Sequence, residues 1–256
     1  MTRPPVDHIE APSFPRMSSW LNVRALRMEE LRGDPVLIEF WDFCRPNSLH
    51  TLPYLKAWDA RYRDAGLHVI GVHSPGFAPA GSRSAVKAAV ARLGIEYPVL
   101  VDSNLEVWRE YDNLGWPARY LFDGAGMLAD YHLGEGGYAE TEAAIQSLLR
   151  LEAAAPVAPV RPEDAPGATL AVQSDDVPGP YSGPYEAGEV WAVLEPAGAT
   201  DGTAPVICAN GVELAVEHPG AYRLISHPVS TEGVLELELG EGIICHAVCF
   251  AAGLAA

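Results

Sequence analysis

The stretch from Pro35 to Leu55 constrains the fold of this chain more than any other segment. Residues 36–43 form an apolar run rich in β-forming residues, which is typical of a central strand buried on both faces. Residues 48–65 follow with helical spacing, because four large side chains fall on one stripe: Leu52, Leu55, Trp58 and Tyr62. A buried strand therefore runs directly into a helix, and a single cysteine, Cys44, lies at the junction.

Strand and helix patterns continue to alternate after this junction. Strands are predicted over residues 67–73, 97–101 and 118–122, and a helix over residues 84–93 that ends at Gly94. Residues 105–111 predict a helical turn or two, residues 127–133 a strand that pairs back as a hairpin, and residues 140–151 a closing helix. This order indicates an α/β sandwich.

The pattern changes in the last third of the chain. Six short strands, separated by Gly, Pro and Asn, are expected, which is typical of an all-β sandwich. They cover residues 190–194, 204–209, 212–216, 221–225, 234–239 and 243–250. The segment before them is rich in Pro and Ala, which break helices and favour an extended spacer. We therefore expect an α/β domain over residues 1–152, a linker over residues 153–167 and a smaller β-sandwich domain over residues 168–256.

Charge and cysteine content exclude several classes of protein. The net charge is -17, so the chain lacks the excess of basic residues that binding to nucleic acid or to anionic membranes requires. No apolar run approaches the ~20 residues that cross a bilayer, and residues 1–8 lack the apolar segment of a secretory signal. Four cysteines in a chain of this length do not suggest a disulfide framework. These features predict a soluble, cytoplasmic protein.

An ordered series of segments carries a family resemblance. It comprises residues 40–43, Asn47, and residues 49–55, 69–75, 97–102, 116–121 and 134–138. With this series the first domain resembles the thioredoxin-like redoxins of the TlpA and DipZ type, within the AhpC/TSA-redoxin superfamily, from about residue 11 to residue 149. The second domain is similar to the β-sandwich that follows the redoxin domain in DipZ-like proteins, a fold similar to carbohydrate-binding modules.

The resemblance also implies where the redox site lies. In the family, two cysteines separated by two residues occupy the junction of strand and helix. When the chains are aligned on Asn47 and residues 51–54, Arg45 falls on the nucleophilic cysteine and Ser48 on the resolving one, whereas Cys44 lies one residue earlier. Both redox positions are therefore substituted, and the motif is degenerate.

A second element of the family's site is a cis-proline loop that faces the redox site and presents its backbone to an extended substrate. Pro117, preceded by Trp116, matches the position of this proline. A cis X-Pro bond is a minority state that a fold must select. We expect Pro117 to be cis, and Trp116 to lie close to Cys44.

Two functions remain open at this point. The first is a thiol-dependent oxidoreductase with Cys44 as the nucleophile, because a thiol at a helix N-terminus beside Arg45 has a lowered pKa and could attack a disulfide or form a sulfenic acid. Its partner would be a protein or small-molecule thiol or disulfide, and no cofactor is expected. The second is a non-catalytic binding or scaffold protein that has lost redox activity. The candidate catalytic residues are Cys44, Arg45, Ser48 and Pro117, and the candidate substrate-binding residues are Trp41, Asn47 and Trp116.

The second domain offers two further candidates. Cys245 and Cys249 would face the same side of a strand about 13 Å apart, which is too far for a disulfide or a shared zinc ion. We therefore predict two buried thiols and no metal site. Tyr181 and Tyr185 lie in a segment rich in Pro and Gly, where they could stack on a sugar or pack within a rigid loop.

Overall fold

A computed structural model describes residues 9–152, 154–197 and 204–256. The expectation for residues 1–8 and the first residue of the predicted linker lie outside the described residues. The chain divides into two compact units. Unit 1 comprises Met1–Asp42, Asn47–Gly76 and Gly81–Ala158, and unit 2 comprises Phe43–Pro46, Phe77–Ala80 and Pro159–Ala256. None of the described helices is long and apolar enough to cross a membrane.

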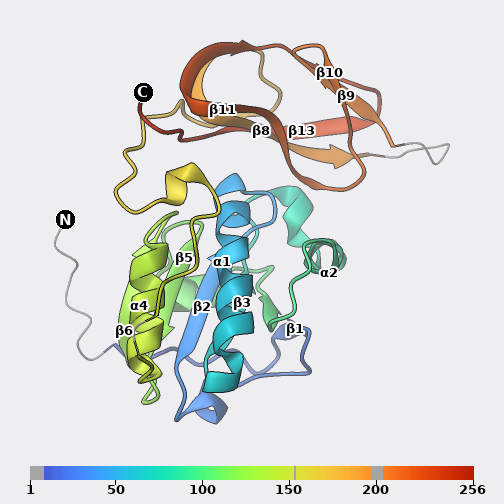
Figure 1. Cartoon of the computed structure of the whole chain (residues 1–256). Coiled ribbons are helices and arrows are strands. Elements are labelled where there is room, and N and C mark those ends of the chain that lie inside the picture. The colour runs from blue at the N-terminus through green and yellow to red at the C-terminus, as the bar shows by residue number, and fades with distance from the viewer. Residues whose placement is uncertain (1–8, 153, 198–203) are drawn as a thin grey trace. The chain divides into compact units, whose positions relative to one another are not determined.

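Unit 1 is an α/β fold built on a six-stranded sheet of order β1-β4-β3-β2-β5-β6. The strands are β1 (Ser19–Leu21), β2 (Val36–Trp41), β3 (His68–His73), β4 (Val99–Val101), β5 (Ala118–Phe122) and β6 (Leu128–Leu133). The pairs β2–β3 and β3–β4 are parallel, and the other pairs are antiparallel. The helices are α1 (Pro46–Tyr62), α2 (Arg83–Arg92), α3 (Glu106–Glu110) and α4 (Tyr138–Leu148), of which α1 and α4 cover one face of the sheet (Figure 1).

The central strand β2 explains why the core forms where it does. All six of its residues are buried. Ile38 and Phe40 pack into an apolar core with Ile70 and Val72 of β3, whereas alternate residues such as Glu39 point to the opposite face, because side chains alternate along a strand. A strand buried on both faces is what the apolar run in the sequence predicted.

Helix α1 begins earlier and ends earlier than its periodicity indicates. It begins at Pro46, since proline is tolerated in the first turn, where its missing N–H has no partner to lose. It ends at Tyr62, and a 3-10 turn (Arg63–Ala65) leads to Gly66, which has a left-handed φ of 104°. That conformation is one that glycine adopts at no steric cost. Strand β1 was not predicted, because three residues are too few to show alternation.

Residues 154–157 of the predicted linker are held by side chains of unit 1. The side chain of Gln146 bonds both the N–H and the carbonyl of Ala154. Arg61 donates to the carbonyl of Ala155 at 3.0 Å, and the carboxylate of Glu142 accepts the N–H of Val157 at 2.7 Å. Side chains of α1 and α4 thus bind this backbone, although its composition suggested a spacer.

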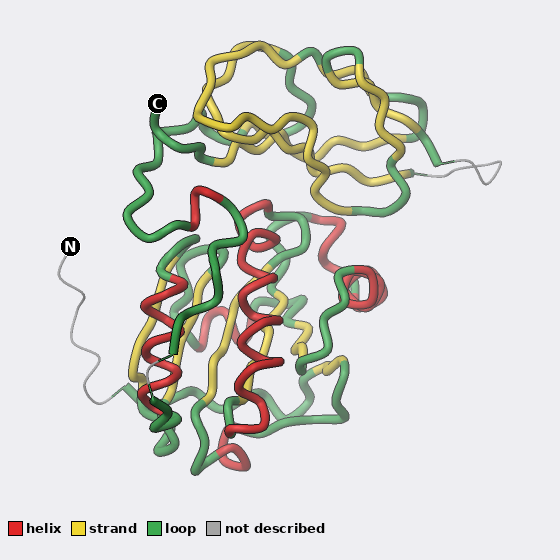
Figure 2. Tube along the Cα trace, in the orientation of Figure 1, coloured by secondary structure: helices red, strands yellow, loops and turns green. Residues whose placement is uncertain are grey.

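Unit 2 contains two antiparallel sheets, of order β11-β8-β13-β7 and β10-β9-β12. Their strands are β7 (Val177–Pro178), β8 (Gly183–Pro196), β9 (Val206–Ala209), β10 (Val212–Ala215), β11 (Gly220–Leu235), β12 (Leu237–Leu239) and β13 (Ile243–Ala251). Strands joined by loops make up most of this unit (Figure 2). Its apolar core includes Ala192, Leu194, Ile207 and Val248. The fold is therefore the predicted combination of a thioredoxin-like α/β domain and a β-sandwich.

Two details of the β-sandwich differ from the expectation. The strands predicted over residues 190–194 and 221–225 are parts of β8, with 14 residues, and β11, with 16 residues. These two strands stay paired through two irregularities in register, between Arg223 and Ile225 and between Ser226 and Thr231. Such irregularities let a strand bend without leaving its partner, so turn-forming residues in the sequence do not end it.

A bulge in β13 corrects the expected placement of two cysteines. Cys245 pairs with Leu194, but the register shifts before Ala247, so that Cys249 pairs with Trp191. Leu194 and Trp191 lie on opposite faces of β8, because they are separated by an odd number of residues. Cys245 therefore faces the core, and the prediction that both thiols face the same side was wrong. Both thiols are buried, as expected.

Candidate functional site

The junction between β2 and α1 is closed by hydrogen bonds to buried side chains. The N–H of Asp42 donates to the hydroxyl of Ser48 at 3.2 Å. The carboxylate of Asp42 accepts the N–H of Gly76 at 2.7 Å. Ser48 lies in the first turn of α1 and is completely buried. The hydroxyl of Ser48 therefore connects the end of the strand to the start of the helix.

Cys44 lies in the turn between β2 and α1, and its exposed fraction is 0%. It is a thiol, not half of a disulfide. The guanidinium of Arg45 lies 4.8 Å from the centre of the Phe77 ring, which is a cation–π distance. A reactive cysteine needs an accessible thiolate, and the burial of Cys44 is instead typical of a cysteine that packs in a core.

The loop before β5 is attached to the same edge of the sheet. The peptide bond between Trp116 and Pro117 is cis. The indole N–H of Trp116 donates to the carbonyl of Ser74 at 2.8 Å, and the N–H of Ser74 donates to the carbonyl of Trp41 at 3.1 Å. Two hydrogen bonds thus connect Trp116 to the last residue of β2. The expected closeness of Trp116 to Cys44 stays a prediction.

The three candidate substrate-binding residues differ in exposure. Trp41 is completely buried and packs edge-to-face on His73, with ring centres 4.9 Å apart. It therefore offers no surface to a ligand. Asn47 and Trp116 are half-buried, and the carbonyl of Asn47 accepts the hydroxyl of Thr51 at 3.1 Å. Of the three residues, only Asn47 and Trp116 reach the surface.

Beneath α1 lies a layer of buried polar groups that the sequence analysis missed. Glu39 and Arg119 are paired across β2 and β5, with the carboxylate 4.0 Å from the guanidinium Nε. Burial raises the pKa of Glu39 to about 8, although Arg119 opposes this effect. Burial also lowers the pKa of His73 to about 3, so this imidazole is neutral. The signal in the sequence was a lone acidic residue within an otherwise apolar strand.

Glycine is required next to this layer. A Cβ atom at Gly71 would lie 2.9 Å from the indole nitrogen of Trp41 and 3.1 Å from the ring of Tyr97. Among the described residues, neither the hydroxyl of Tyr97 nor the carboxyl oxygens of Glu39 have a hydrogen-bond partner. Burial raises the pKa of Tyr97 well above its usual value, and the neighbouring carboxylates add to this effect.

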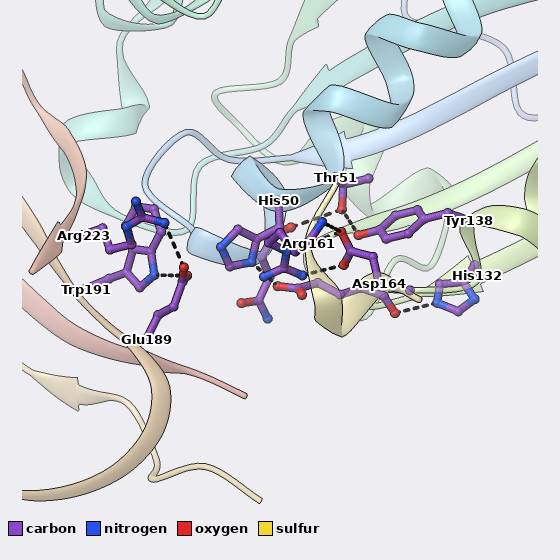
Figure 3. Close-up of polar contacts among 12 residues, drawn as sticks. His50, Thr51, His132, Tyr138, Arg161, Asp164, Glu189, Trp191 and Arg223 are labelled. Atoms are coloured by element: carbon purple, nitrogen blue, oxygen red, sulfur yellow. Dashed lines mark hydrogen bonds and ion pairs between the residues drawn. The ribbon is translucent and has the colours of Figure 1, made fainter. Parts of the chain in front are cut away.

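A third polar cluster joins α1 to the glycine-rich turn before α4. The Nδ1 atom of His50 lies 2.9 Å from the carboxylate of Glu135, and the carbonyl of Glu135 lies 2.8 Å from Nε2 of His132 (Figure 3). A Cβ atom at Gly137 would lie 2.5 Å from the His132 ring, which explains the glycine at this position. The cluster fixes the turn on α1 and brings no further nucleophile into the site.

In unit 2, the two candidate tyrosines pack on the β-sandwich. Tyr185 is buried and stacks on Phe250, with ring centres 5.9 Å apart, and its hydroxyl lies 2.9 Å from His227. Tyr181 meets the edge of the same Phe250 ring at 6.2 Å. The packing role is the one that fits these contacts, because Tyr185 has no exposed ring face for a sugar.

The thiols of β13 are unsuited to nucleophilic chemistry. Burial raises the pKa of Cys245 to about 11. The pKa of Cys249 is also raised, mainly by burial and further by Asp176. Within the described ranges, no group of three or more His, Cys, Asp or Glu residues is arranged to hold a metal ion. Nearby, Glu189 accepts hydrogen bonds from Trp191 at 2.9 Å and Arg223 at 3.0 Å (Figure 3).

Comparison with known proteins identifies the class of the N-terminal domain. Residues 10–131 match the AhpC/TSA family. The N-terminal domain therefore has a thioredoxin-like α/β fold, and its sequence is similar to that of redoxins in this family and of thiol-disulfide oxidoreductases.

Two curated relatives and one solved structure illustrate the similarity. The Protein DipZ of Mycobacterium tuberculosis is 38% identical over 142 residues, which are 54% of this chain but only 20% of DipZ. The thiol-disulfide oxidoreductase YkuV of Bacillus subtilis is 27% identical over 138 residues, 54% of this chain and 93% of YkuV. A thiol-disulfide isomerase from Corynebacterium glutamicum, 24% identical, covers 56% of this chain and 98% of its own, with a TM-score of 0.48.

Proposed function

We propose that this protein is a non-catalytic member of the redoxin family that binds an extended polypeptide. The binding edge would be formed by the first turn of α1 and the Trp116–Pro117 loop. The observation that carries the proposal is the state of the three positions on which exchange chemistry would depend. The family resemblance aligns Arg45 and Ser48 with the two redox positions, and Cys44 has an exposed fraction of 0%.

The chemical argument follows from how disulfides exchange. A thiolate must attack a substrate disulfide and form a mixed disulfide, and a second thiol must then resolve it. Neither Arg45 nor Ser48 can perform either step. The hydroxyl of Ser48 accepts the N–H of Asp42 and so supports the start of α1. The fold of the family is kept at this edge, whereas the chemistry of a dithiol is absent from it.

The alternative is a thiol-dependent oxidoreductase in which Cys44 is the nucleophile. The similarity to YkuV, which is named as a thiol-disulfide oxidoreductase, favours this alternative. It requires the buried Cys44 sulfur to become accessible to a thiol or disulfide partner. In either case we place the protein in the cytoplasm, because four cysteines that form no disulfide fit a reducing compartment.

Activity assays with three variants separate these functions. Reduction of insulin disulfides and consumption of peroxide would be measured for the wild type, for Cys44→Ser and for the double variant Arg45→Cys/Ser48→Cys. We expect background turnover for the wild type and for Cys44→Ser. The double variant restores two cysteines separated by two residues and serves as the positive control, so we expect it to reduce insulin. Turnover by the wild type that Cys44→Ser abolishes would establish the oxidoreductase instead.

A binding measurement tests the proposal directly. The probe is a fluorescein-labelled insulin B chain in which serine replaces cysteine, so that no thiol chemistry contributes to affinity. We expect saturable binding to the wild type by fluorescence anisotropy, and the same affinity for Cys44→Ser. Absence of binding to the wild type would refute a polypeptide-binding function.

A further inference from the structure

Four residues behind the cis-proline loop form a closed circuit of contacts. The indole N–H of Trp116 donates to the carbonyl of Ser74 at 2.8 Å. The hydroxyl of Ser74 donates to the carboxylate of Asp102 at 3.0 Å, and this carboxylate accepts the N–H of Trp108 at 2.9 Å. The rings of Trp108 and Trp116 then lie 4.2 Å apart at 37°. The circuit therefore returns to the residue at which it begins.

Each member of the circuit comes from a different segment of unit 1. Ser74 follows β3, Asp102 follows β4, Trp108 lies on α3, and Trp116 precedes β5. Ser74 and Asp102 are buried, with exposed fractions of 0% and 4%. A buried carboxylate that accepts several hydrogen bonds is a strong anchor, because these bonds are charge-assisted. The circuit is thus anchored in the core and ends in a half-buried indole.

Asp102 also holds the backbone that carries the Trp108 side chain. Its carboxylate accepts the N–H of Val107 at 3.0 Å as well as that of Trp108. These are backbone donors in the first turn of α3, which have no partner within the helix. Because the helix start is held in this way, Trp108 presents its ring to Trp116 from a fixed backbone. The indole N–H of Trp116 is consequently bound by Ser74, and its ring packs against the ring of Trp108.

We propose that this circuit is a positioning device that holds Trp116 ready to contact an apolar side chain of the bound polypeptide. Ser74, Asp102 and Trp108 are positioning residues, and Trp116 is the residue that touches the ligand. Leu114, which is 83% exposed two residues before Trp116, extends the apolar surface. A large aromatic side chain that is already ordered loses little conformational freedom on binding. The inference rests on the proposed function and adds the side chain that sets affinity.

The test compares substitutions at Trp108, which is distinct from the contact residue. Trp108→Phe keeps an aromatic ring beside Trp116, whereas Trp108→Leu removes it. Affinity for the labelled, serine-substituted insulin B chain is measured by anisotropy, with Trp116→Ala as the contact control. Hydrogen exchange of the Trp116 indole N–H, followed by NMR, measures how well its hydrogen bond to Ser74 is protected, independently of ligand binding. Chemical denaturation establishes that each variant is folded under the assay conditions.

We expect Trp116→Ala and Trp108→Leu to weaken binding at least about tenfold, as truncation of a central aromatic contact does. Trp108→Phe should stay within about twofold of the wild type. The indole N–H of Trp116 should exchange faster in Trp108→Leu than in Trp108→Phe. Equal affinity and equal exchange in the two Trp108 variants would overturn the inference while leaving the proposed function intact. A wild type that does not bind the probe would overturn both.

Discussion

The buried carboxyl of Glu39 makes a quantitative prediction about stability. Its pKa rises from 4.5 to about 8 on folding, because burial disfavours the charged form more than Arg119 favours it. Between the pKa of the unfolded state and the raised pKa of the folded state, the folded protein keeps the proton of this carboxyl and the unfolded protein has lost it. The free energy of unfolding therefore falls as the pH rises from about 4.5 to about 8, and it levels off above that range.

The magnitude follows from about 1.4 kcal/mol per pKa unit. The titration of Glu39 lowers the free energy of unfolding by about 5 kcal/mol in total. About 2 kcal/mol of this decrease occurs below pH 6, and the rest occurs between pH 6 and pH 9. The isosteric substitution Glu39→Gln removes the titration. We therefore expect the difference in free energy of unfolding, Glu39→Gln minus wild type, to increase by about 3 kcal/mol from pH 6 to pH 9.

Urea denaturation at several pH values measures this difference. Any constant effect of the substitution on the packing of Arg119 shifts the whole curve and leaves its slope unchanged, so the slope isolates the carboxyl. His73, on the same face of the sheet, is neutral throughout this range because its pKa is about 3. Parallel curves for the wild type and Glu39→Gln would refute the conclusion that Glu39 is protonated in the folded protein near neutral pH.

Three further predictions follow from contacts in the structure. In the native protein, iodoacetamide should modify the half-buried Cys208 well before Cys44, and unfolding in urea should equalise the rates, as peptide mass spectrometry would establish. Glu142→Ala should lower the free energy of unfolding, measured by urea denaturation, by about 3 kcal/mol, because Trp58, Tyr62 and Arg61 lose a buried hydrogen-bond acceptor. A decrease of less than about 1 kcal/mol would contradict this prediction. Asn22→Ala should cost about 1–2 kcal/mol by the same assay, because Asn22 has a positive φ and its side chain bonds two carbonyls. Asn22→Gly can adopt the positive φ without strain, so its free energy of unfolding should fall only by the contribution of the two side-chain hydrogen bonds.

The order of the elements was predictable because its signals are local. The apolar run over β2, the helical stripe of α1 and the hairpin of β5 and β6 can each be recognised within about a dozen residues. The first and last residues of these elements were less predictable. The sequence predicted short strands over residues 190–194 and 221–225, but the pairing of β8 with β11 continues through two irregularities in register.

The candidate site was only partly predictable for a related reason. The prediction that Arg45 and Ser48 replace the two redox cysteines could be made from the sequence, because it depends on spacing along the chain. The burial of Cys44 and Trp41 could not, because exposure depends on what packs around a residue. The partners of Trp116 were equally hidden: Ser74 and Trp116 are 42 residues apart in the sequence.

The sequence by itself determined that a thioredoxin-like α/β domain precedes a β-rich domain, and that no second cysteine lies near Cys44 at the junction of strand and helix. Tertiary structure alone decided that the Cys44 thiol is buried, that Glu39 lies beside Arg119 in a buried layer, and that a bulge places Cys245 and Cys249 on opposite faces of β13. The physical reason is that periodicity and spacing are properties of neighbouring residues. Burial, pKa and hydrogen-bond partners depend on segments that only folding brings together.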